Sequence, residues 1–457
     1  MATQPITNQQ ELPGAERWRF PLAALHEFFT DALDEVTHGN RSYHIWMASL
    51  TLVMCAGAWA YTAQLSQGLT VTGMHDHVSW GLYISNFTFL VGVAAAAVVL
   101  VLPTYVLHNV AFKKAVLIGE AMAVAAVVMA IAFVVVDVGG PARLWHVTPL
   151  IGVFNWPQSL LAWDIVVLNV YLVINISVPF YILFSHYRYQ EPNPRVYVPA
   201  MLMSILWAVS LHLVTAFLFA GLAARPHWNN SLMGPRFLAT AFTAGPALMI
   251  LVLQIISKQT AYQIRQETIQ KLALVVTVAA QITVVMTISE MFKEFYFPTH
   301  HSLSSQYLFF GLHGHHALRA WIWTAVAMIV VATVVLSVHR LRKRSWTLNA
   351  SCLLLFFGIL IEKGLGTVVP GFIPENWGKI HEYLPTGTEL MITAGIWAGG
   401  AFLFTILAKV GVAVELGELR VTPSAQNGLA PDITQRYPAA PIDEWSENER
   451  LGKGAKP

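Results

Sequence analysis

Ionisable and hydrogen-bonding side chains gather at the beginning of a long apolar run that continues to Leu102. In this stretch His75 and Asp76 can exchange protons, while Trp80 and Asn86 can hydrogen-bond a ligand. A polar side chain in or beside a membrane span costs free energy unless it has a partner, so such residues are candidates for function. The pattern predicts a binding site at a membrane surface. Helix capping and headgroup anchoring explain any single one of these residues equally well.

Residues of the same chemical types recur near later apolar segments. Asp137 and Arg143 flank the turn at residues 139–141, where either a catalytic base or a structural ion pair fits them. His212 lies inside an apolar run, so we expect a neutral ring that either handles protons or bonds another helix. Acidic residues within predicted spans, which could carry protons or bond helix ends, are Glu120, Asp164, Glu290 and Glu362.

Composition places the chain among integral membrane proteins, because 56% of its 457 residues are hydrophobic and only 11% are charged. Ten apolar segments are each long enough to cross a bilayer. They cover residues 43–64, 79–107, 115–137, 159–185, 198–223, 237–257, 272–293, 309–338, 348–370 and 387–412. The sequence therefore predicts an all-α protein with ten transmembrane helices in a membrane domain at residues 43–413.

The segments that flank this domain are polar. Residues 1–42 contain one amphipathic stretch, whose apolar positions recur at helical spacing and predict a helix lying on the membrane. These positions are Leu22, Leu25, Phe29, Leu33 and Val36. Residues 414–457 are polar and rich in Pro, Asn, Glu and Gly, so we expect a flexible tail.

The distribution of lysine and arginine predicts the orientation. The loops on one side hold Lys113, Lys114, Arg188, Arg195, Lys258, Arg265, Lys271, Arg340, Arg342, Lys343 and Arg344. The opposite loops hold Arg143, Arg225, Arg236, Lys293, Lys363 and Lys379. Because basic loops face the cytoplasm, we expect both termini inside and the loops rich in His and Trp on the outer face of the cytoplasmic (inner) membrane.

The cysteines and histidines bear on redox cofactors. Cys55 and Cys352 are too few to hold an iron–sulfur cluster, and no Cys-x-x-Cys-His attaches a covalent haem, so we expect neither in this chain. A b-type haem remains an alternative, in which His212 pairs with a residue of the cluster His313, His315 and His316. That cluster lies near the outer end of its span and His212 lies deeper, so the two ligands would sit at different depths in the membrane.

Two further alternatives are a metal site and a transporter. His300 and His301 are adjacent in a loop without acidic or cysteine neighbours, which is weak evidence for metal binding and favours a docking surface. Ten helices with intramembrane acids also describe many secondary transporters. Matched helices broken by Gly or Pro near mid-membrane are the usual indication of a carrier, and the prolines here lie mostly towards helix ends.

Several motifs resemble those of the NrfD-like, or polysulfide reductase (PsrC-like), membrane subunits, which bind quinone and partner an iron–sulfur protein. The motifs are Trp80-Gly-Leu-Tyr-Ile-Ser-Asn86-Phe and residues 137–143, 211–228 and 235–242. Residues 307–318 and 361–374 are similar to the ten-helix branch of the family, that of DsrP in the DsrMKJOP complex of dissimilatory sulfur metabolism. The resemblance covers roughly residues 43–412.

This resemblance implies two four-helix bundles plus two extra helices, and a quinone pocket for menaquinone or ubiquinone near the outer face. It also implies a periplasmic ferredoxin-like iron–sulfur partner and further membrane and cytochrome subunits, with no nucleic acid partner. Asp76, Asp137 and His212 become catalytic candidates, and the quinone-binding candidates are His75, Trp80, Asn86, Arg143, Arg225, Trp228 and Arg236. This chain departs from the family at Phe87, where some members place a histidine against the quinone.

Loops on the predicted outer face carry the residue types of a docking surface. The loops cover residues 224–231, 297–305 and 374–385. Their candidate anchors are Trp228, Phe297, Trp377 and Tyr383, with Arg225 and Lys379 for charge pairing. The alternative is that the aromatic residues belong to the belt found at both edges of membrane proteins.

Overall fold

The computed structural model describes residues 22–94, 96–106, 112–148, 151–297, 299, 302–373 and 379–421. Across these ranges the chain is helical and has no strand. Ten helical segments in them are long and apolar enough to cross a membrane. The predicted fold class and number of spans are therefore confirmed.

Apart from the eighth, the long helices follow the predicted segments closely. They are α2 (Arg41–Gln67), α3 (Leu82–Ala94) continued by α4 (Ala96–Val101), α5 (Lys113–Asp137), α6 (Leu160–Tyr187), α7 (Pro194–Ala220), α8 (Met233–Gln259), α9 (Gln266–Tyr296), α11 (Arg319–Ser337), α13 (Ser345–Lys363) and α15 (Gly387–Leu416). Shorter elements are α1 (Leu22–Thr37), α10 (Ser302–Phe309), α12 (His339–Arg342), α14 (Leu365–Val368), the 3₁₀ helices η1 (Gly68–Val71), η4 (Pro141–Val147) and η5 (Val369–Phe372), and the π-helix η2 (Leu102–Val106).

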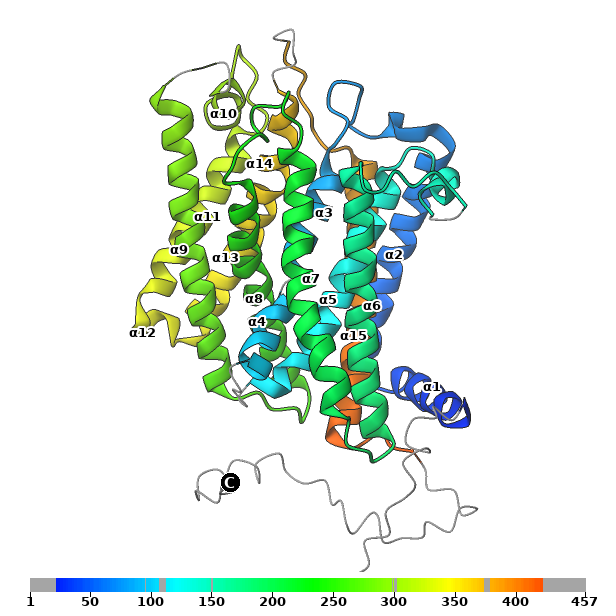
Figure 1. Ribbon diagram of the computed structural model, residues 1–457. Helices are drawn as coiled ribbons and strands as arrows, with labels where there is room; N and C mark the ends of the chain where they lie inside the picture. The colour runs from blue at the N-terminus through cyan, green and yellow to red at the C-terminus, as the bar shows by residue number, and fades with distance from the viewer. Residues whose placement is uncertain are drawn as a thin grey trace, which may run out of the picture.

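These helices pack side by side in two groups of four (Figure 1). In one group, α5 and α7 each contact α3 and α6; in the other, α9 and α13 each contact α8 and α11. The contact between α3 and α8 joins the groups, and α2 pairs with α15 at the edge. A Cβ at Gly57 would lie 2.7 Å from the Cα of Gly395, so glycine at these positions allows α2 and α15 to pack closely.

Helix α3 lies at the centre of the molecule (Figure 1). Every residue from Tyr83 to Ala94 is buried, which matches its almost uninterrupted apolar sequence. We call the end of the molecule formed by residues 68–81, 221–232 and 379–386 the upper end, as it lies in Figure 1, and the opposite end the lower end. Residues just before α3 therefore lie at the upper end.

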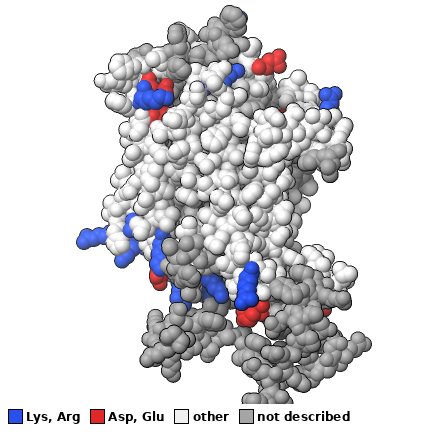
Figure 2. All heavy atoms as spheres, viewed as in Figure 1, with Lys and Arg blue, Asp and Glu red and all other residues white. Residues whose placement is uncertain are grey.

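Basic residues gather at the lower end (Figure 2), where blue atoms border an uncharged belt. Two residues assigned to the opposite loops by sequence are not loop charges. The side chain of Arg236 lies in α8 and binds two carboxylates, and Lys363 is 2% exposed within α13. The asymmetry of exposed charge between the two ends is therefore sharper than the sequence predicted.

The predicted start of the eighth span at residue 309 is wrong, because α11 begins at Arg319. Gly311, His313 and Gly314 all have positive φ, and an isolated antiparallel bridge pairs Leu312 with His315. A left-handed backbone at three of four positions cannot continue a right-handed helix, so the chain turns here before α11.

The two ends of the described chain meet at the lower end of the molecule. Phe28 and Ala32 of α1 are buried in a cluster that includes Tyr187 and Leu419, whereas the predicted membrane-facing residues Leu22, Phe29 and Leu33 are exposed. Residues 414–421 were predicted to belong to the flexible tail. Instead α15 continues to Leu416, and the Val421 N–H donates to the Tyr187 carbonyl at 3.0 Å. Residues 422–457 lie outside the described ranges.

Candidate functional site

A cavity of about 450 Å³ opens at the upper end of the molecule. Three parts of the chain form it: residues before α3, the loop after α7, and η5. Its lining residues are Ser79, Trp80, Gly221, Leu222, Ala223, Ala224, Arg225, Trp228 and Phe372. This volume lies in the range of small-molecule sites, about 300–1,000 Å³. We call it the aromatic cavity.

Aromatic rings form the wall of this cavity. The ring centroid of Trp80 lies 5.6 Å from those of Phe219 and Trp228 and 5.9 Å from that of Phe372. The Arg225 guanidinium stands 5.2 Å from the Phe372 ring centroid. Arg225 is the charged residue of the lining. The cavity therefore combines flat apolar faces with one strong hydrogen-bond donor, a combination suited to a planar ligand that carries oxygen atoms.

Trp228 is fixed by a hydrogen bond and a glycine. Its indole N–H donates to the Thr367 carbonyl at 2.8 Å, and the side chain is 1% exposed. A Cβ at Gly371 would lie 1.9 Å from an indole carbon, so only glycine allows the ring to pack here. The backbone N–H of Trp228 also bonds the Arg225 carbonyl at 3.1 Å, which makes residues 225–228 a tight turn.

The first candidate residues lie beside the aromatic cavity but do not line it. His75 and Asp76 are exposed in a turn closed by the bridge between His75 and Val78. The ring of His381 packs against this turn, 4.0 Å from His77 and 5.7 Å from His75. This cluster of rings is part of the upper surface.

Asn86 faces a helix interface instead of the aromatic cavity. Its side-chain oxygen accepts a hydrogen bond from the Trp397 indole at 2.8 Å, and its amide donates to the Leu82 carbonyl at 2.8 Å. The residue is 3% exposed. Asn86, a quinone-binding candidate by sequence, therefore joins α3 to α15 through its side chain.

Asp137 and Arg143 do not form the ion pair considered from sequence. Arg143 is exposed on η4, and Asp137 Oδ1 is buried without a hydrogen-bond partner among the described residues. Near Asp137, the Tyr83 hydroxyl donates to Gln64 at 2.7 Å and Gln64 donates to the Val136 carbonyl at 2.6 Å. Asp137 therefore belongs to a polar cluster on the far side of α3 from the aromatic cavity.

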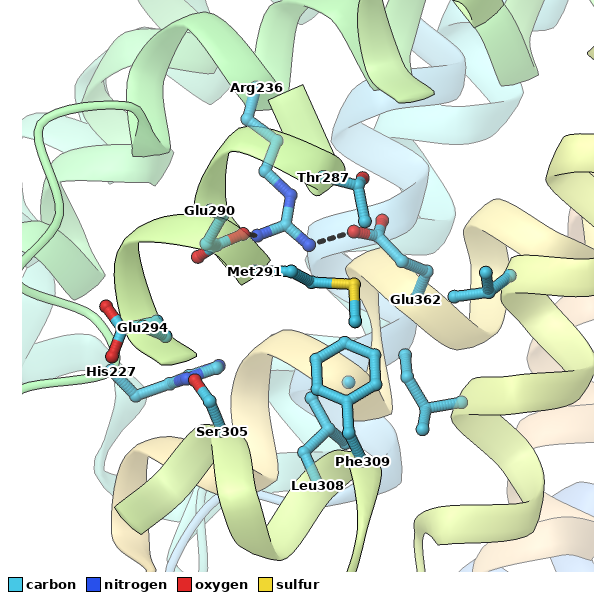
Figure 3. A pocket seen from close by; sticks show the side chains of 13 residues that line it. His227, Arg236, Thr287, Glu290, Met291, Glu294, Ser305, Leu308, Phe309 and Glu362 are labelled. Atoms are coloured by element: carbon cyan, nitrogen blue, oxygen red, sulfur yellow. Dashed lines mark hydrogen bonds and ion pairs between the residues drawn. The ribbon is translucent and has the colours of Figure 1, made fainter. Parts of the chain in front are cut away.

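A second, smaller cavity of about 20 Å³ lies between α8, α9, α10, α11 and α13, large enough for one water molecule. Figure 3 shows Arg236 between Glu290 and Glu362, with both ion pairs formed. Asn230 donates to Glu290 at 3.1 Å, and Glu362 Oε2 is buried without a hydrogen-bond partner in the described part of the chain. We call this the acidic cavity; His227 and Glu294 also line it.

His212 and Lys363 lie deeper in the protein. His212 is 0% exposed, its Nδ1 lies 2.6 Å from the Ala208 carbonyl, and no hydrogen-bond partner of its Nε2 is found among the described residues. Lys363 Nζ lies 3.2 Å from the Phe237 carbonyl and 4.5 Å from the Phe237 ring centroid. Neither residue lines the aromatic cavity. His315 bonds Glu382 at 3.2 Å, so the histidines of the haem alternative are engaged separately.

Of the four acidic candidates within spans, two lie together and two lie apart. Glu290 and Glu362 meet at Arg236. Asp164 accepts a hydrogen bond from Thr215 at 2.8 Å near the start of α6, and Glu120 is buried near the start of α5. Because α5 and α6 run in opposite directions, these two carboxyls lie towards opposite ends of the first group of helices.

The docking candidates are only partly available. Trp228 is 1% exposed and Tyr383 is 0% exposed, so neither can anchor a partner from its present position. The Tyr383 hydroxyl donates to Glu389 at 2.7 Å and accepts from the Leu82 N–H at 2.8 Å. Burial and the Glu389 carboxylate raise the pKa of Tyr383, which keeps its hydroxyl protonated. Phe297 is 71% exposed, while His300, His301 and Trp377 lie outside the described residues.

The sequence reasoning missed His227, Phe219 and Phe372. His227 stands beside Arg225 and Trp228, which were candidates, but the residues that share the acidic cavity with it come from later helices, α8 to α13. Phe219 and Phe372 resemble any other aromatic residue of an apolar span. Only their positions at span ends beside Arg225 and Gly371 could have indicated a role.

The fold and site define a helical membrane protein with an aromatic cavity at one end of its spans. Residues 70–368 match the family described as polysulphide reductase, NrfD, and the chain belongs to this family. This membership confirms the resemblance to NrfD-like subunits that the motifs indicated.

Relatives cover most of the chain at low identity. A putative membrane subunit of dimethyl sulfoxide reductase from Halobacterium salinarum is 24% identical over 78% of this chain and 87% of the relative. A selenate reductase subunit from Mesobacillus selenatarsenatis is 20% identical over 80% and 93%. The Hdr-like menaquinol oxidoreductase integral membrane subunit of Archaeoglobus fulgidus is 23% identical over 80% and 93%.

Proposed function

We propose that this chain is the quinone-interacting membrane subunit of a respiratory redox complex and that the aromatic cavity receives the quinone head group. The observation that carries the proposal is the joint placement of Trp80, Arg225 and Phe372 around about 450 Å³ at the end of the spans. A lipid-soluble quinone has a flat ring for aromatic walls and two oxygens that accept hydrogen bonds. The relative named as a menaquinol oxidoreductase subunit supports menaquinone as the first candidate.

The residues of the cavity have defined tasks in this proposal. The Arg225 guanidinium donates a charge-assisted hydrogen bond to one ring oxygen. The rings of Trp80 and Phe372 hold the quinone plane and exclude water from one side. His75 and Asp76 lie in the exposed turn beside the entrance, where they can exchange protons with the solvent.

The upper end faces outwards in this proposal, because the lower end carries the basic residues. A periplasmic iron–sulfur subunit then docks over the aromatic cavity and exchanges electrons with the quinone. The exposed residues Phe297 and Lys379 are available for that contact. Dimethyl sulfoxide and selenate reductases in the names of relatives support a multi-subunit reductase; a role in dissimilatory sulfur metabolism remains part of the proposal.

The test compares Arg225→Gln with Arg143→Gln in the purified complex. Arg143 is a matched control, because it is exposed at the same end and does not line the cavity. Loss of a charge-assisted hydrogen bond of about 1.5–3 kcal/mol should weaken quinone binding by roughly 10- to 100-fold in Arg225→Gln. Binding of a short-chain menaquinone analogue is measured by titration in nanodiscs.

The control variant should bind the analogue as the wild type does. Unchanged affinity in both Arg225→Gln and Trp80→Leu, with unchanged thermal midpoints, would place the quinone outside the aromatic cavity. Equal weakening in Arg143→Gln would show that the effect reflects surface charge rather than a contact in the cavity.

A further inference from the structure

The connection between α11 and α13 carries a dense group of positive charges. We call residues 338–344 the basic turn; its basic residues are His339, Arg340, Arg342, Lys343 and Arg344. No Asp or Glu occurs in residues 295–361, so the hairpin of α11 and α13 supplies no carboxylate to neutralise these charges. The basic turn contains α12, which lies at the edge of the second group of helices towards the lower end (Figure 1).

Other parts of the described chain leave these charges unpaired as well. Two basic residues elsewhere at the lower end do find carboxylates: Lys271 pairs with Glu267 at 2.6 Å, and Lys409 pairs with Glu35 at 3.1 Å. No carboxylate in the described ranges forms an ion pair with the basic turn. Positive charges gathered in one place raise the local concentration of anions. The basic turn therefore attracts an anion from outside this chain.

The side chains of the basic turn have two different roles. Arg342 donates to the Leu336 carbonyl at 3.1 Å, so its guanidinium is used to close the end of α11. The three exposed basic residues are Arg340, Lys343 and Arg344. They are three and four positions apart along a helical turn, which places them on one side of it. One face of the basic turn thus presents three positive charges.

The lengths of the flanking helices place this face at the depth of the lipid headgroups. Helices α11 and α13 have 19 residues each, which span about 28 Å at about 1.5 Å per residue. The hydrocarbon core of a bilayer is about 30 Å thick. Helix α15 has 30 residues, and its lower end extends further than α12 in Figure 1. The basic turn therefore lies close to the membrane instead of projecting into water.

An exposed apolar face continues from the basic turn into the membrane. Trp346, in the first turn of α13, is 76% exposed, and Leu353 and Phe357 are also exposed. These residues are seven and eleven positions from Trp346, so they share one face of the helix. Tryptophan is enriched where headgroups meet acyl chains. A molecule bound here can place a charged group at the basic turn and an apolar chain beside α13.

We propose that the basic turn binds the headgroup phosphate of an anionic phospholipid, whose acyl chain lies along the face of Trp346. Arginine binds phosphate through paired N–H donors, and lysine adds a point charge. A soluble acidic protein would satisfy the charges but leave the adjoining apolar face without a contact. This lipid site is independent of the proposed function, because the aromatic cavity lies at the opposite end of the molecule.

The experiment titrates the purified full-length chain, in neutral detergent, with phosphatidylglycerol labelled on an acyl chain, and follows fluorescence anisotropy. Each basic residue near an anionic surface strengthens binding by about fivefold. Lys343→Gln should therefore weaken binding by about fivefold, and the triple variant Arg340→Gln/Lys343→Gln/Arg344→Gln by about 100-fold. The variant Arg340→Lys/Arg344→Lys should keep most of the affinity, because it retains the charge. Thermal midpoints measured without lipid check that each variant is folded.

A matched control removes the same charge from three other helix ends. Lys113→Gln/Arg195→Gln/Lys258→Gln changes exposed residues of α5, α7 and α8 at the lower end, and it should bind the labelled lipid nearly as the wild type does. Wild-type affinity in the triple variant of the basic turn would overturn the proposal. Equal weakening in the control would also overturn it, by showing that only the total charge matters.

Competition identifies the chemistry of the ligand. Unlabelled phosphatidylglycerol should displace the labelled lipid, whereas phosphatidylcholine with the same acyl chains and inorganic phosphate should not. Displacement by phosphatidylcholine would show that the charges are not recognised, and displacement by phosphate would indicate a site for a free anion. Loss of a partner subunit from the assembled complex of the triple variant, at unchanged lipid affinity, would assign the basic turn to a protein instead.

Discussion

The aromatic cavity and the acidic cavity lie on opposite sides of one turn and have contrasting linings. Aromatic rings, small apolar residues and a single guanidinium line the first, whereas the second adds three carboxylates, an arginine and a histidine to its apolar lining. The first can bind a flat molecule but has no carboxylate to take its proton. The second holds ion pairs and has room only for water. The comparison teaches that the space for a ligand and the buried ion pairs are divided between neighbouring compartments.

The largest expected effect comes from Arg236→Leu, which should disrupt the acidic cavity and leave the lining of the aromatic cavity unchanged. Removing Arg236 leaves Glu290 and Glu362 buried without their partner, at a cost of about 3–5 kcal/mol. The thermal midpoint in detergent should fall strongly. Arg225→Gln should leave it unchanged, and an equal fall in both variants would contradict the division into two compartments.

A smaller effect is expected from Asn86→Leu. This substitution removes the hydrogen bond to the Trp397 indole and should destabilise the protein by about 1–3 kcal/mol, because a partly buried donor is left without an acceptor. Quinone affinity should be unchanged, since Asn86 does not line the aromatic cavity. Thermal unfolding and analogue titration on the same sample test this. If quinone affinity falls while the thermal unfolding midpoint stays unchanged, Asn86 contacts the quinone instead.

The smallest effect is expected from Glu382→Gln at the upper surface. Burial opposes ionisation, but bonds from the Ala317 N–H and from His315 prevail and hold the pKa of Glu382 below its ordinary value. A lowered pKa in the folded state stabilises the protein above the unfolded pKa of about 4.3, and this stabilisation disappears as the pH falls through the folded value. Because the pair of Glu382 and His315 is partly exposed, the free energies of unfolding of wild type and Glu382→Gln should differ by under about 1 kcal/mol.

Thermal midpoints of wild type and Glu382→Gln, measured from pH 3 to 8, check this prediction. The wild type should be the more stable protein at pH 6, and the two curves should converge in acid. A difference that stays constant across this range would show that the ion pair does not contribute.

The sequence predicted the number and placement of the spans because length and hydrophobicity are properties of each segment by itself. It also identified Trp80, Arg225 and Trp228 as candidates, and these three meet at one cavity. The sequence did not show that Asn86, another candidate, lies outside this cavity. On a helix, successive residues point about 100° apart, so side chains close in sequence can face different neighbours.

The chain by itself determined a ten-span helical protein with basic residues at one end, since apolar segments of membrane length and the count of loop charges require no knowledge of packing. Only the tertiary structure decided which polar residues share a compartment. Phe372 reaches Trp80 because Gly371 lets Trp228 pack against η5, and His227 meets Glu290 because Asn230 ties the loop to α9. Such contacts depend on the rotation of each helix and the path of each loop, which are fixed when the helices pack together.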